Sequence, residues 1–176
     1  MMYYISGGER SGKSRYAQDL ALQLSDNPVY LATARQWDGD FQQRISRHVA
    51  DRDERWTTLE EEKYLGEVAI SGRVVVLDCI TLWLTNWFVD CQQNLDEAFA
   101  QAKAELEKLF AKQATLIIIS NEIGMGLHAQ TPTGRKFTEL QGWINQFIAH
   151  RANSATFMVS GLPLTLKAHD QAKSHL

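Results

Sequence analysis

Apolar segments with two different periodicities alternate along this chain. Short, nearly continuous apolar runs, which are typical of buried strands, occur at residues 2–6, 29–33, 73–78, 115–120 and 156–160. Between them, apolar residues recur at helical spacing, as in the sets Ala17, Leu20, Ala21, Leu24 and Phe99, Ala102, Leu106, Leu109, Phe110. This alternation predicts an α/β fold in which helices cover both faces of a mostly parallel sheet.

Three further helices are expected from weaker patterns. Asp38 and Asp40 are candidate caps for a helix over about residues 41–51, and a second helix is expected over residues 60–70, with its end near Gly72. Thr131 and Pro132 have the residue types of a helix cap and a first helical position, so they predict a helix that starts there. A tryptophan pair, Trp83 and Trp87, has the i, i+4 spacing of core or subunit-interface residues.

The apolar character of each run predicts where its strand lies within the sheet. The runs 73–78 and 115–120 are apolar on both faces, so they are expected inside the sheet. Residues 164–167 are expected to add an edge strand. A single domain over residues 1–176 is predicted, in which about 168–176 form a polar, loosely held tail.

Composition excludes several classes of protein. A net charge of −3 over 176 residues argues against nucleic-acid binding by bulk electrostatics. Two cysteines that are not in a C-x-x-C pair give no disulfide framework or zinc site, and they are typical of a reducing, cytoplasmic environment. No apolar stretch approaches the roughly 20 residues of a membrane span. Because the chain begins directly with a strand, no signal peptide is expected.

Residues 7–14 read GGERSGKS, a complete phosphate-binding loop of the form G-x-x-x-x-G-K-S. It lies directly between a predicted strand and a predicted helix, which is the structural context that this motif requires. The glycines allow backbone N–H groups to surround phosphate oxygens, and the helix N-terminus favours the same anion. Lys13 is expected to reach the β- and γ-phosphates, and the Ser14 hydroxyl to ligate Mg²⁺. The sequence therefore predicts binding of a nucleoside triphosphate.

A second acidic position supports this site. Asp78 ends an apolar strand, as the acid of a Walker B strand does, and such an acid holds Mg²⁺ directly or through water. The alternative is a carboxylate that merely faces solvent at a strand end. Because ligands of such sheets bind beyond the carboxyl ends of the strands, we expect one rim to collect residues 7–14, Thr33–Arg35, Asp78, Asn121–Glu122 and Ser160–Gly161.

The motifs of a regulatory GTPase are missing. No N-K-x-D follows the strand 115–120, where the sequence instead has NEIGMG at residues 121–126, and no D-x-x-G follows Asp78. Three classes of enzyme remain. One is a nucleotidyl transferase, and the alternatives to it are a P-loop ATPase that drives conformational change in an oligomer and a simple small-molecule kinase.

His48 is the candidate nucleophile of a nucleotidyl transferase. A neutral imidazole can attack an α-phosphorus and carry the nucleotidyl group as a phosphoramidate, and Arg44 and Arg47 could stabilise the charge. Spacing alone favours another interpretation, because Phe41, Ile45 and His48 share one helical face and a lone histidine often packs there.

Seven short motifs together resemble one known family, the bifunctional adenosylcobinamide kinase/adenosylcobinamide-phosphate guanylyltransferases of cobalamin biosynthesis. They occur in order over nearly the whole chain, and the combination is far more specific than the phosphate loop alone. The matching segments are GGERSGKSR at 7–15, YLAT at 30–33, RISRH at 44–48, DR at 51–52 with WTTLE at 56–60, DCITLWLTN at 78–86, NEIGMG at 121–126 and VSG at 159–161.

The resemblance implies a RecA-like P-loop fold, assembly as a homotrimer and two reactions. In the first, a nucleoside triphosphate (ATP or GTP) phosphorylates the aminopropanol hydroxyl of adenosylcobinamide. In the second, GTP transfers GMP to that phosphate through a GMP–histidine intermediate, and pyrophosphate is released. His48 lies where the family has this histidine, so the resemblance favours the catalytic interpretation of His48 over packing.

The resemblance also implies which residues bind the substrates. Lys13 and His48 are expected to be catalytic, and Ser14 and Asp78 to hold Mg²⁺. Asp78 stands where the family pattern has a glutamate, which favours a water-mediated contact. His128 follows the NEIGMG loop and could line the corrinoid site, although a solvated loop residue is the plainer interpretation. The nucleotide contacts implied are Gly8, Glu9, Arg10, Ser11, Gly12, Lys13, Ser14, Arg15, Thr33, Ala34, Arg35, Asp51, Arg52, Glu60 and Asp78.

Overall fold

The architecture is a single sheet between two layers of helices. The structure is a computed structural model and describes residues 1–35 and 53–168. Seven strands hydrogen-bond in the order β3-β2-β4-β5-β1-β6-β7, and every pairing except β6–β7 is parallel. The strands are β1 Met2–Gly7, β2 Val29–Ala32, β3 Thr57–Glu60, β4 Val74–Asp78, β5 Thr115–Asn121, β6 Ser154–Val159 and β7 Leu162–Lys167. The predicted α/β class is therefore confirmed.

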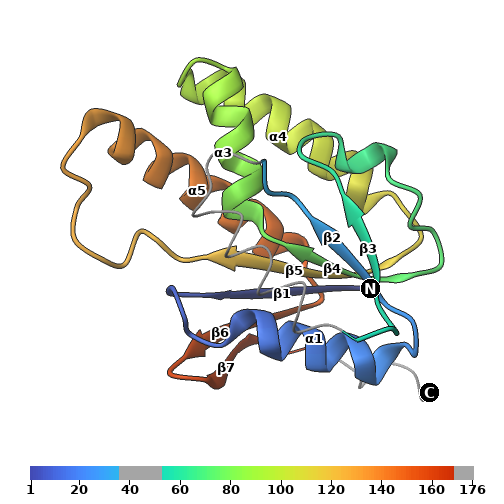
Figure 1. The fold of residues 1–176 in the computed structure, drawn as a ribbon. Coiled ribbons are helices and arrows are strands. Elements are labelled where there is room, and N and C mark those ends of the chain that lie inside the picture. Colours follow the sequence, from blue (N-terminus) through green and yellow to red (C-terminus); the bar gives the residue numbers. More distant parts are fainter. Residues whose placement is uncertain (36–52, 169–176) are drawn as a thin grey trace, which may run out of the picture.

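Among the residues that the structure describes, helices lie on both faces of the sheet. α1 (Lys13–Leu24) lies on one face, and α3 (Ile80–Asp90), α4 (Leu95–Phe110) and α5 (Pro132–Arg151) lie on the other (Figure 1). Among the described residues, none of these helices combines the length and apolar character needed to cross a membrane.

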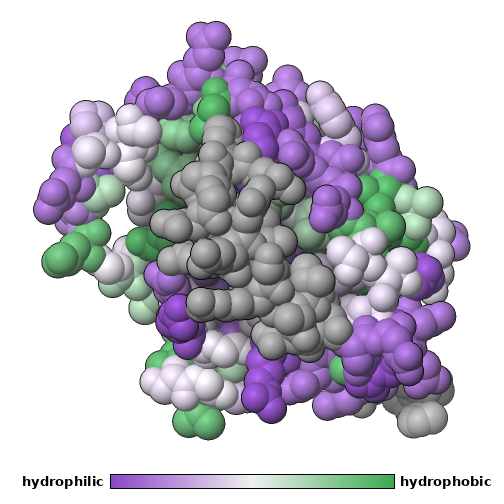
Figure 2. Space-filling model, viewed as in Figure 1, coloured by the Kyte–Doolittle hydropathy of each residue, from purple (hydrophilic) through white to green (hydrophobic). Residues whose placement is uncertain are grey.

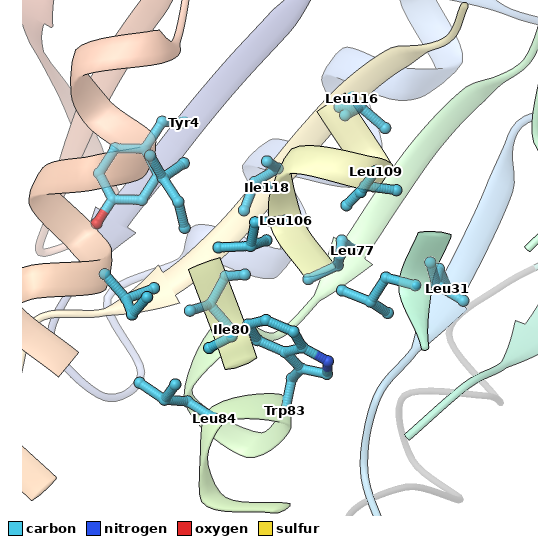
Figure 3. Close-up of a cluster of buried hydrophobic side chains, with 14 of the residues drawn as sticks. Tyr4, Leu31, Leu77, Ile80, Trp83, Leu84, Leu106, Leu109, Leu116 and Ile118 are labelled. Carbon is cyan, nitrogen blue, oxygen red and sulfur yellow. The ribbon is translucent and has the colours of Figure 1, made fainter. Parts of the chain in front are cut away.

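Each face of the sheet has its own apolar core. The larger core packs Leu31, Leu77 and Ile118 of the strands against Trp83 of α3 and Leu106 of α4 (Figure 3). The smaller core packs α1 against the opposite sides of the same strands. Alternation of side chains along a strand explains the division, because neighbouring residues such as Tyr30 and Leu31 enter different cores.

The strongest sequence signals are confirmed. β4 and β5 lie inside the sheet, and β7 forms the predicted edge strand. Thr131 accepts a hydrogen bond from the backbone N–H of Gly134, with Pro132 as the first helical residue, so α5 begins where the sequence predicts. Trp83 and Trp87 are buried in the larger core, as expected for core residues.

The helix predicted over residues 60–70 is wrong. Strand β3, which pairs in parallel with β2 and was not predicted from sequence, ends at Glu60, and the residues after it form only a short 3-10 turn at Leu65–Glu67. The Glu61 carboxylate accepts hydrogen bonds from the backbone N–H groups of Lys63 and Tyr64, and such local bonds compete with a helix.

Two further differences concern helices. α3 was not assigned from sequence because its residues are apolar nearly all round and so show no amphipathic face, as expected for a helix buried in the core. The helix expected over about 41–51 and most of the predicted tail lie outside the described residues.

Candidate nucleotide-binding site

The phosphate loop connects β1 to α1 at the carboxyl edge of the sheet. Gly12 has φ of 94°, which is the left-handed conformation that glycine adopts without steric cost. A Cβ at Gly7 would lie 2.6 Å from the carbonyl oxygen of Met158, so β6 passes too close for a larger residue. These two positions explain why the loop needs glycine at both ends.

Lys13 is buried inside this loop. Its ammonium donates hydrogen bonds to the Gly8 carbonyl oxygen, at 2.5 Å, and to Ser11 Oγ, at 3.4 Å. Burial lowers the pKa of Lys13, and the nearby Cys79, Asp78 and Glu9 partly offset this effect. A phosphate oxygen is a stronger acceptor for an ammonium than a neutral carbonyl, so Lys13 is placed to exchange Gly8 for a bound phosphate.

Two hydroxyl groups meet at the carboxylate of Asp78. Ser14 Oγ donates to Oδ2 of Asp78 at 3.2 Å, and the Tyr30 hydroxyl donates to the same oxygen at 2.6 Å. β2 and β4 are neighbours, with Ala32 opposite Asp78, so Tyr30 lies two residues earlier on the same face. The sequence predicted Ser14 and Asp78 but not Tyr30, because no sequence signal gives the pairing of β2 with β4.

Ser14 and Asp78 form a donor set that fits Mg²⁺. Within the described residues, no group of three or more His, Cys, Asp or Glu side chains could hold a metal by itself. Mg²⁺ binds commonly through one or two protein oxygens while substrate phosphates and water supply the rest. A hydroxyl and a carboxylate beside a phosphate loop match that requirement.

Cys79 follows Asp78 directly but is not a candidate nucleophile. Its side chain is buried, and burial raises the pKa of the thiol to about 12. The nucleophilic form of cysteine is the thiolate, so this side chain stays neutral and unreactive at ordinary pH.

Thr33 joins the ends of β2 and β4. Its backbone N–H donates to the Asp78 carbonyl at 3.3 Å, and its Oγ1 donates to the Cys79 carbonyl at 2.9 Å. The side chain is fully buried. Thr33 therefore supports the backbone of the site from behind, and Ala34 and Arg35 continue the chain along the rim.

Arg35 is held by acidic side chains. Its guanidinium pairs with Asp90 at 2.9 Å, at the end of α3, and with Glu62 at 2.8 Å. Lys63 also contacts Asp90, at 2.8 Å. These partners raise the pKa of Arg35 and lower that of Asp90, so both groups are charged at neutral pH.

Asn86 of α3 fixes the same region from inside. Its amide nitrogen donates to the carbonyl oxygens of Thr33, at 3.0 Å, and Glu62, at 2.9 Å. The side chain is fully buried, and the bond to Thr33 is buried with it, so this bond satisfies a backbone carbonyl group inside the protein. Neither Asn86 nor Asp90 was predicted from sequence as part of a site.

The other expected rim segments also meet the phosphate loop. The backbone N–H of Glu122 donates to the Gly7 carbonyl at 3.0 Å, and that of Gly161 donates to the Ser11 carbonyl at 3.0 Å. Asn121 is fixed through its backbone, with its N–H bonded to Thr81 and its carbonyl to the side chain of Asn145. The predicted meeting of these segments at one edge is observed.

The remaining predicted contacts differ in how the structure places them. Glu9, Arg10 and Arg15 are exposed around the loop, and Glu60 is exposed beside Ala32 at the end of β3. His48, Asp51 and Arg52 lie outside the described residues, so their roles stay predictions.

Comparison with known proteins identifies the family. A family model described as cobinamide kinase / cobinamide phosphate guanyltransferase matches residues 3–166. This chain belongs to that family. The matched span includes both the phosphate loop and the α3 region, and the family description names two activities, a cobinamide kinase and a cobinamide phosphate guanyltransferase.

Curated relatives agree with this assignment. The chain is 41% identical over 168 residues to the bifunctional adenosylcobalamin biosynthesis protein CobP of Pseudomonas aeruginosa, covering 93% of this chain and 95% of that protein. It is 34% identical over 182 residues to CobU of Escherichia coli, which has the same description, covering 95% of this chain and 100% of that protein. Among solved structures, the flagellar accessory protein FlaH of Methanocaldococcus jannaschii is 17% identical to this chain. The similarity covers 99% of this chain and 81% of the FlaH chain, with a TM-score of 0.48.

Proposed function

We propose that this chain catalyses two successive reactions at one phosphate-binding site. In the first, ATP or GTP donates its γ-phosphoryl group to the aminopropanol hydroxyl of adenosylcobinamide. In the second, GTP donates GMP to that new phosphate, which gives adenosylcobinamide-GDP and pyrophosphate. The observation that supports a shared site most directly is the loop 7–14, with the Lys13 ammonium inside it and the Ser14–Asp78 pair beside it.

The phosphoryl transfer depends on positioning and charge. Backbone N–H groups of the loop and the N-terminus of α1 would surround the β-phosphate, while Lys13 would neutralise charge on the β- and γ-phosphates. Ser14 and Asp78 would hold Mg²⁺, which supplies further charge neutralisation between the phosphates when it is bound.

The guanylyl transfer needs a protein nucleophile, for which we propose His48. Its neutral imidazole attacks the α-phosphorus of GTP and pyrophosphate leaves, which produces a phosphoramidate. An oxygen of adenosylcobinamide phosphate then attacks the same phosphorus and releases the histidine. Arg44 and Arg47 would stabilise the charge on the transferring group. The sequence further supports Asp51, Arg52 and Glu60 as contacts to the guanine nucleotide.

Labelled GTP tests this proposal and separates it from its alternatives. The protein is incubated with GTP labelled in the α-phosphate and then denatured. We expect covalent label that is lost in acid and comparatively stable in alkali, as for a histidine phosphoramidate. Loss of all label on denaturation would instead favour a simple kinase or an ATPase.

The rate at which this label forms should depend on pH. Attack needs the neutral imidazole, so formation should slow as the pH falls through the histidine titration near about 6.5. Nearby arginines disfavour the imidazolium form and would shift this titration downward. A rate that is flat between pH 5 and 8 would contradict a histidine nucleophile.

We also propose that the chain acts as a homotrimer in the cytoplasm. Three leucines on one side of β7 (Leu162, Leu164 and Leu166) are each more than half exposed, which supports a contact between subunits. Sedimentation tests this assignment: we expect a trimeric mass, and Leu164→Glu should lower the apparent mass, while Thr165→Glu on the other side of the strand should not. A monomeric parent protein would contradict the trimer.

A further inference from the structure

We propose that Tyr30 is a positioning residue for the metal site, because its hydroxyl orients the Asp78 carboxylate toward the bound Mg²⁺–nucleotide. This inference rests on the proposed function, in which Ser14 and Asp78 hold the metal. Tyr30 begins the YLAT segment at 30–33, but no role was predicted for this side chain from the sequence. Among the described residues, two hydroxyl groups bond to the Asp78 carboxylate, and that of Tyr30 is the closer one, at 2.6 Å.

The tyrosine is itself rigidly held. Only 4% of its surface is exposed, and its ring packs in the smaller core, between the sheet and α1. The edge of Trp56 meets it at a centroid distance of 6.2 Å and an interplanar angle of 80°. A buried aromatic ring has few alternative rotamers, so its hydroxyl is fixed in space at the carboxyl edge of the sheet.

The two hydroxyl groups that bond to Asp78 bind the same carboxylate oxygen. Both Ser14 and Tyr30 donate to Oδ2, whereas Oδ1 has no hydrogen-bond donor among the residues that the structure describes. Two donors on one oxygen fix the rotation of the carboxylate and leave Oδ1 for the metal or a metal-bound water. A serine hydroxyl can bind a metal through its oxygen lone pair while it still donates its hydrogen to Oδ2.

A purely structural role would predict different behaviour. If the bond to Asp78 only gave the buried Tyr30 hydroxyl a hydrogen-bond partner, loss of the hydroxyl would change the stability of the fold but not the response to Mg²⁺. If it orients the carboxylate, its loss weakens the metal site even though the fold survives. Partners that orient metal ligands typically contribute about 10- to 100-fold to metal affinity.

Binding of a guanosine triphosphate analogue with an α,β-methylene bridge tests the inference. Guanylyl transfer cannot release pyrophosphate from this analogue, and phosphoryl transfer does not occur when adenosylcobinamide is left out. Calorimetry measures its affinity over a series of Mg²⁺ concentrations and in EDTA, for the parent protein, Tyr30→Phe and the control Tyr3→Phe. Tyr3 packs against the same core from β1. For Tyr30→Phe we expect the half-saturating Mg²⁺ concentration to rise about tenfold, with unchanged affinity in EDTA. Tyr3→Phe should match the parent.

Two outcomes would overturn the inference and are distinguishable. An unchanged Mg²⁺ response in Tyr30→Phe, in a parent protein whose binding does depend on Mg²⁺, would overturn the role of Tyr30 alone. A parent protein with no Mg²⁺ dependence would overturn the proposed metal site together with it. A double variant adds a test of mechanism: in Asp78→Asn, the further change Tyr30→Phe should have almost no effect, because the hydroxyl acts through that carboxylate.

Discussion

Two neighbouring regions of the rim are built in different ways. The phosphate corner, consisting of residues 7–14, Tyr30 and Asp78, is held by buried side chains and by tight backbone geometry. The α3 corner, consisting of residues 33–35, Glu62, Asn86 and Asp90, is held by one buried amide and by partly exposed ion pairs. In the proposed function the first presents charge to phosphates, whereas the second fixes the chain at residue 35, shortly before the sequence position of His48.

This difference suggests that the two reactions depend unequally on the two corners. Both reactions need a bound triphosphate, so both should depend on the phosphate corner. Only guanylyl transfer needs the nucleophile, so it should depend more on how the chain leaves the α3 corner. The following variants test that division.

The largest effect is expected for Lys13→Ala. Removal of the ammonium leaves the phosphates of either substrate complex without their buried counter-charge, so kinase and guanylyltransferase rates should both fall by at least about a hundredfold. Steady-state assays of each reaction and circular dichroism measure this effect. Kinase turnover near the parent rate would contradict a single phosphate site.

The next effect separates the reactions completely. His48→Asn keeps a polar side chain but removes the nucleophile, so covalent GMP and guanylyl transfer should be abolished. Phosphorylation of adenosylcobinamide should continue, since phosphoryl transfer requires no protein nucleophile. Denaturing gels with α-labelled GTP and a separate kinase assay provide the measurement. Persistent covalent GMP would exclude His48 and make His128 the next candidate.

A partial effect is expected for Asn86→Leu in the α3 corner. Loss of the amide leaves the buried carbonyl group of Thr33 and the partly buried one of Glu62 without this donor, which should lower the free energy of unfolding by about 1–3 kcal/mol. Guanylyl transfer should fall more than phosphoryl transfer per folded molecule. Urea unfolding and both assays test this, with Val89→Ala as a control on the exposed side of the same helix. Equal loss of both rates would contradict the division between the corners.

The smallest effect concerns pH. Arg35 and Lys63 lower the pKa of Asp90 in the folded protein, so the unfolded chain takes up this proton first as the pH falls. The stabilisation from Asp90 should therefore be complete above its unfolded pKa, near about 3.9, and lost as the pH falls toward the lowered folded value. Unfolding curves of the parent and Asp90→Asn should differ by a constant amount from pH 8 to 5 and converge below about pH 4. A difference that vanished already at pH 6 would assign the effect to another group.

The contrast between the corners also explains what the sequence could predict. Residues 7–14 carry their geometry within eight consecutive positions, and the apolar strand that ends at Asp78 is equally local. Both were therefore predicted, together with the meeting of the rim segments. The strand order was not predicted, because the pairing of β2 with β3 and β4 is not encoded within any one of these segments.

The contacts that the sequence did not predict join residues that are far apart along the chain. The Tyr30–Asp78 bond joins positions 48 residues apart, and the Arg35–Asp90 pair joins positions 55 apart. No periodicity reports such contacts, and the apolar character of residues 80–90 hid the helix that carries Asn86. The assignments of His48, Asp51 and Arg52 depend on motif resemblance alone.

The turn between β6 and β7 links the sheet edge to the phosphate loop. Ser160 and Gly161 have φ of 53° and 81°, typical of a tight hairpin turn, and the N–H of Gly161 donates to the Ser11 carbonyl. A subunit contact on β7 that shifted this turn would therefore be thermodynamically coupled to occupancy of the loop. Reciprocity then requires that any nucleotide whose affinity is changed by assembly changes the association constant of the subunits by the same factor.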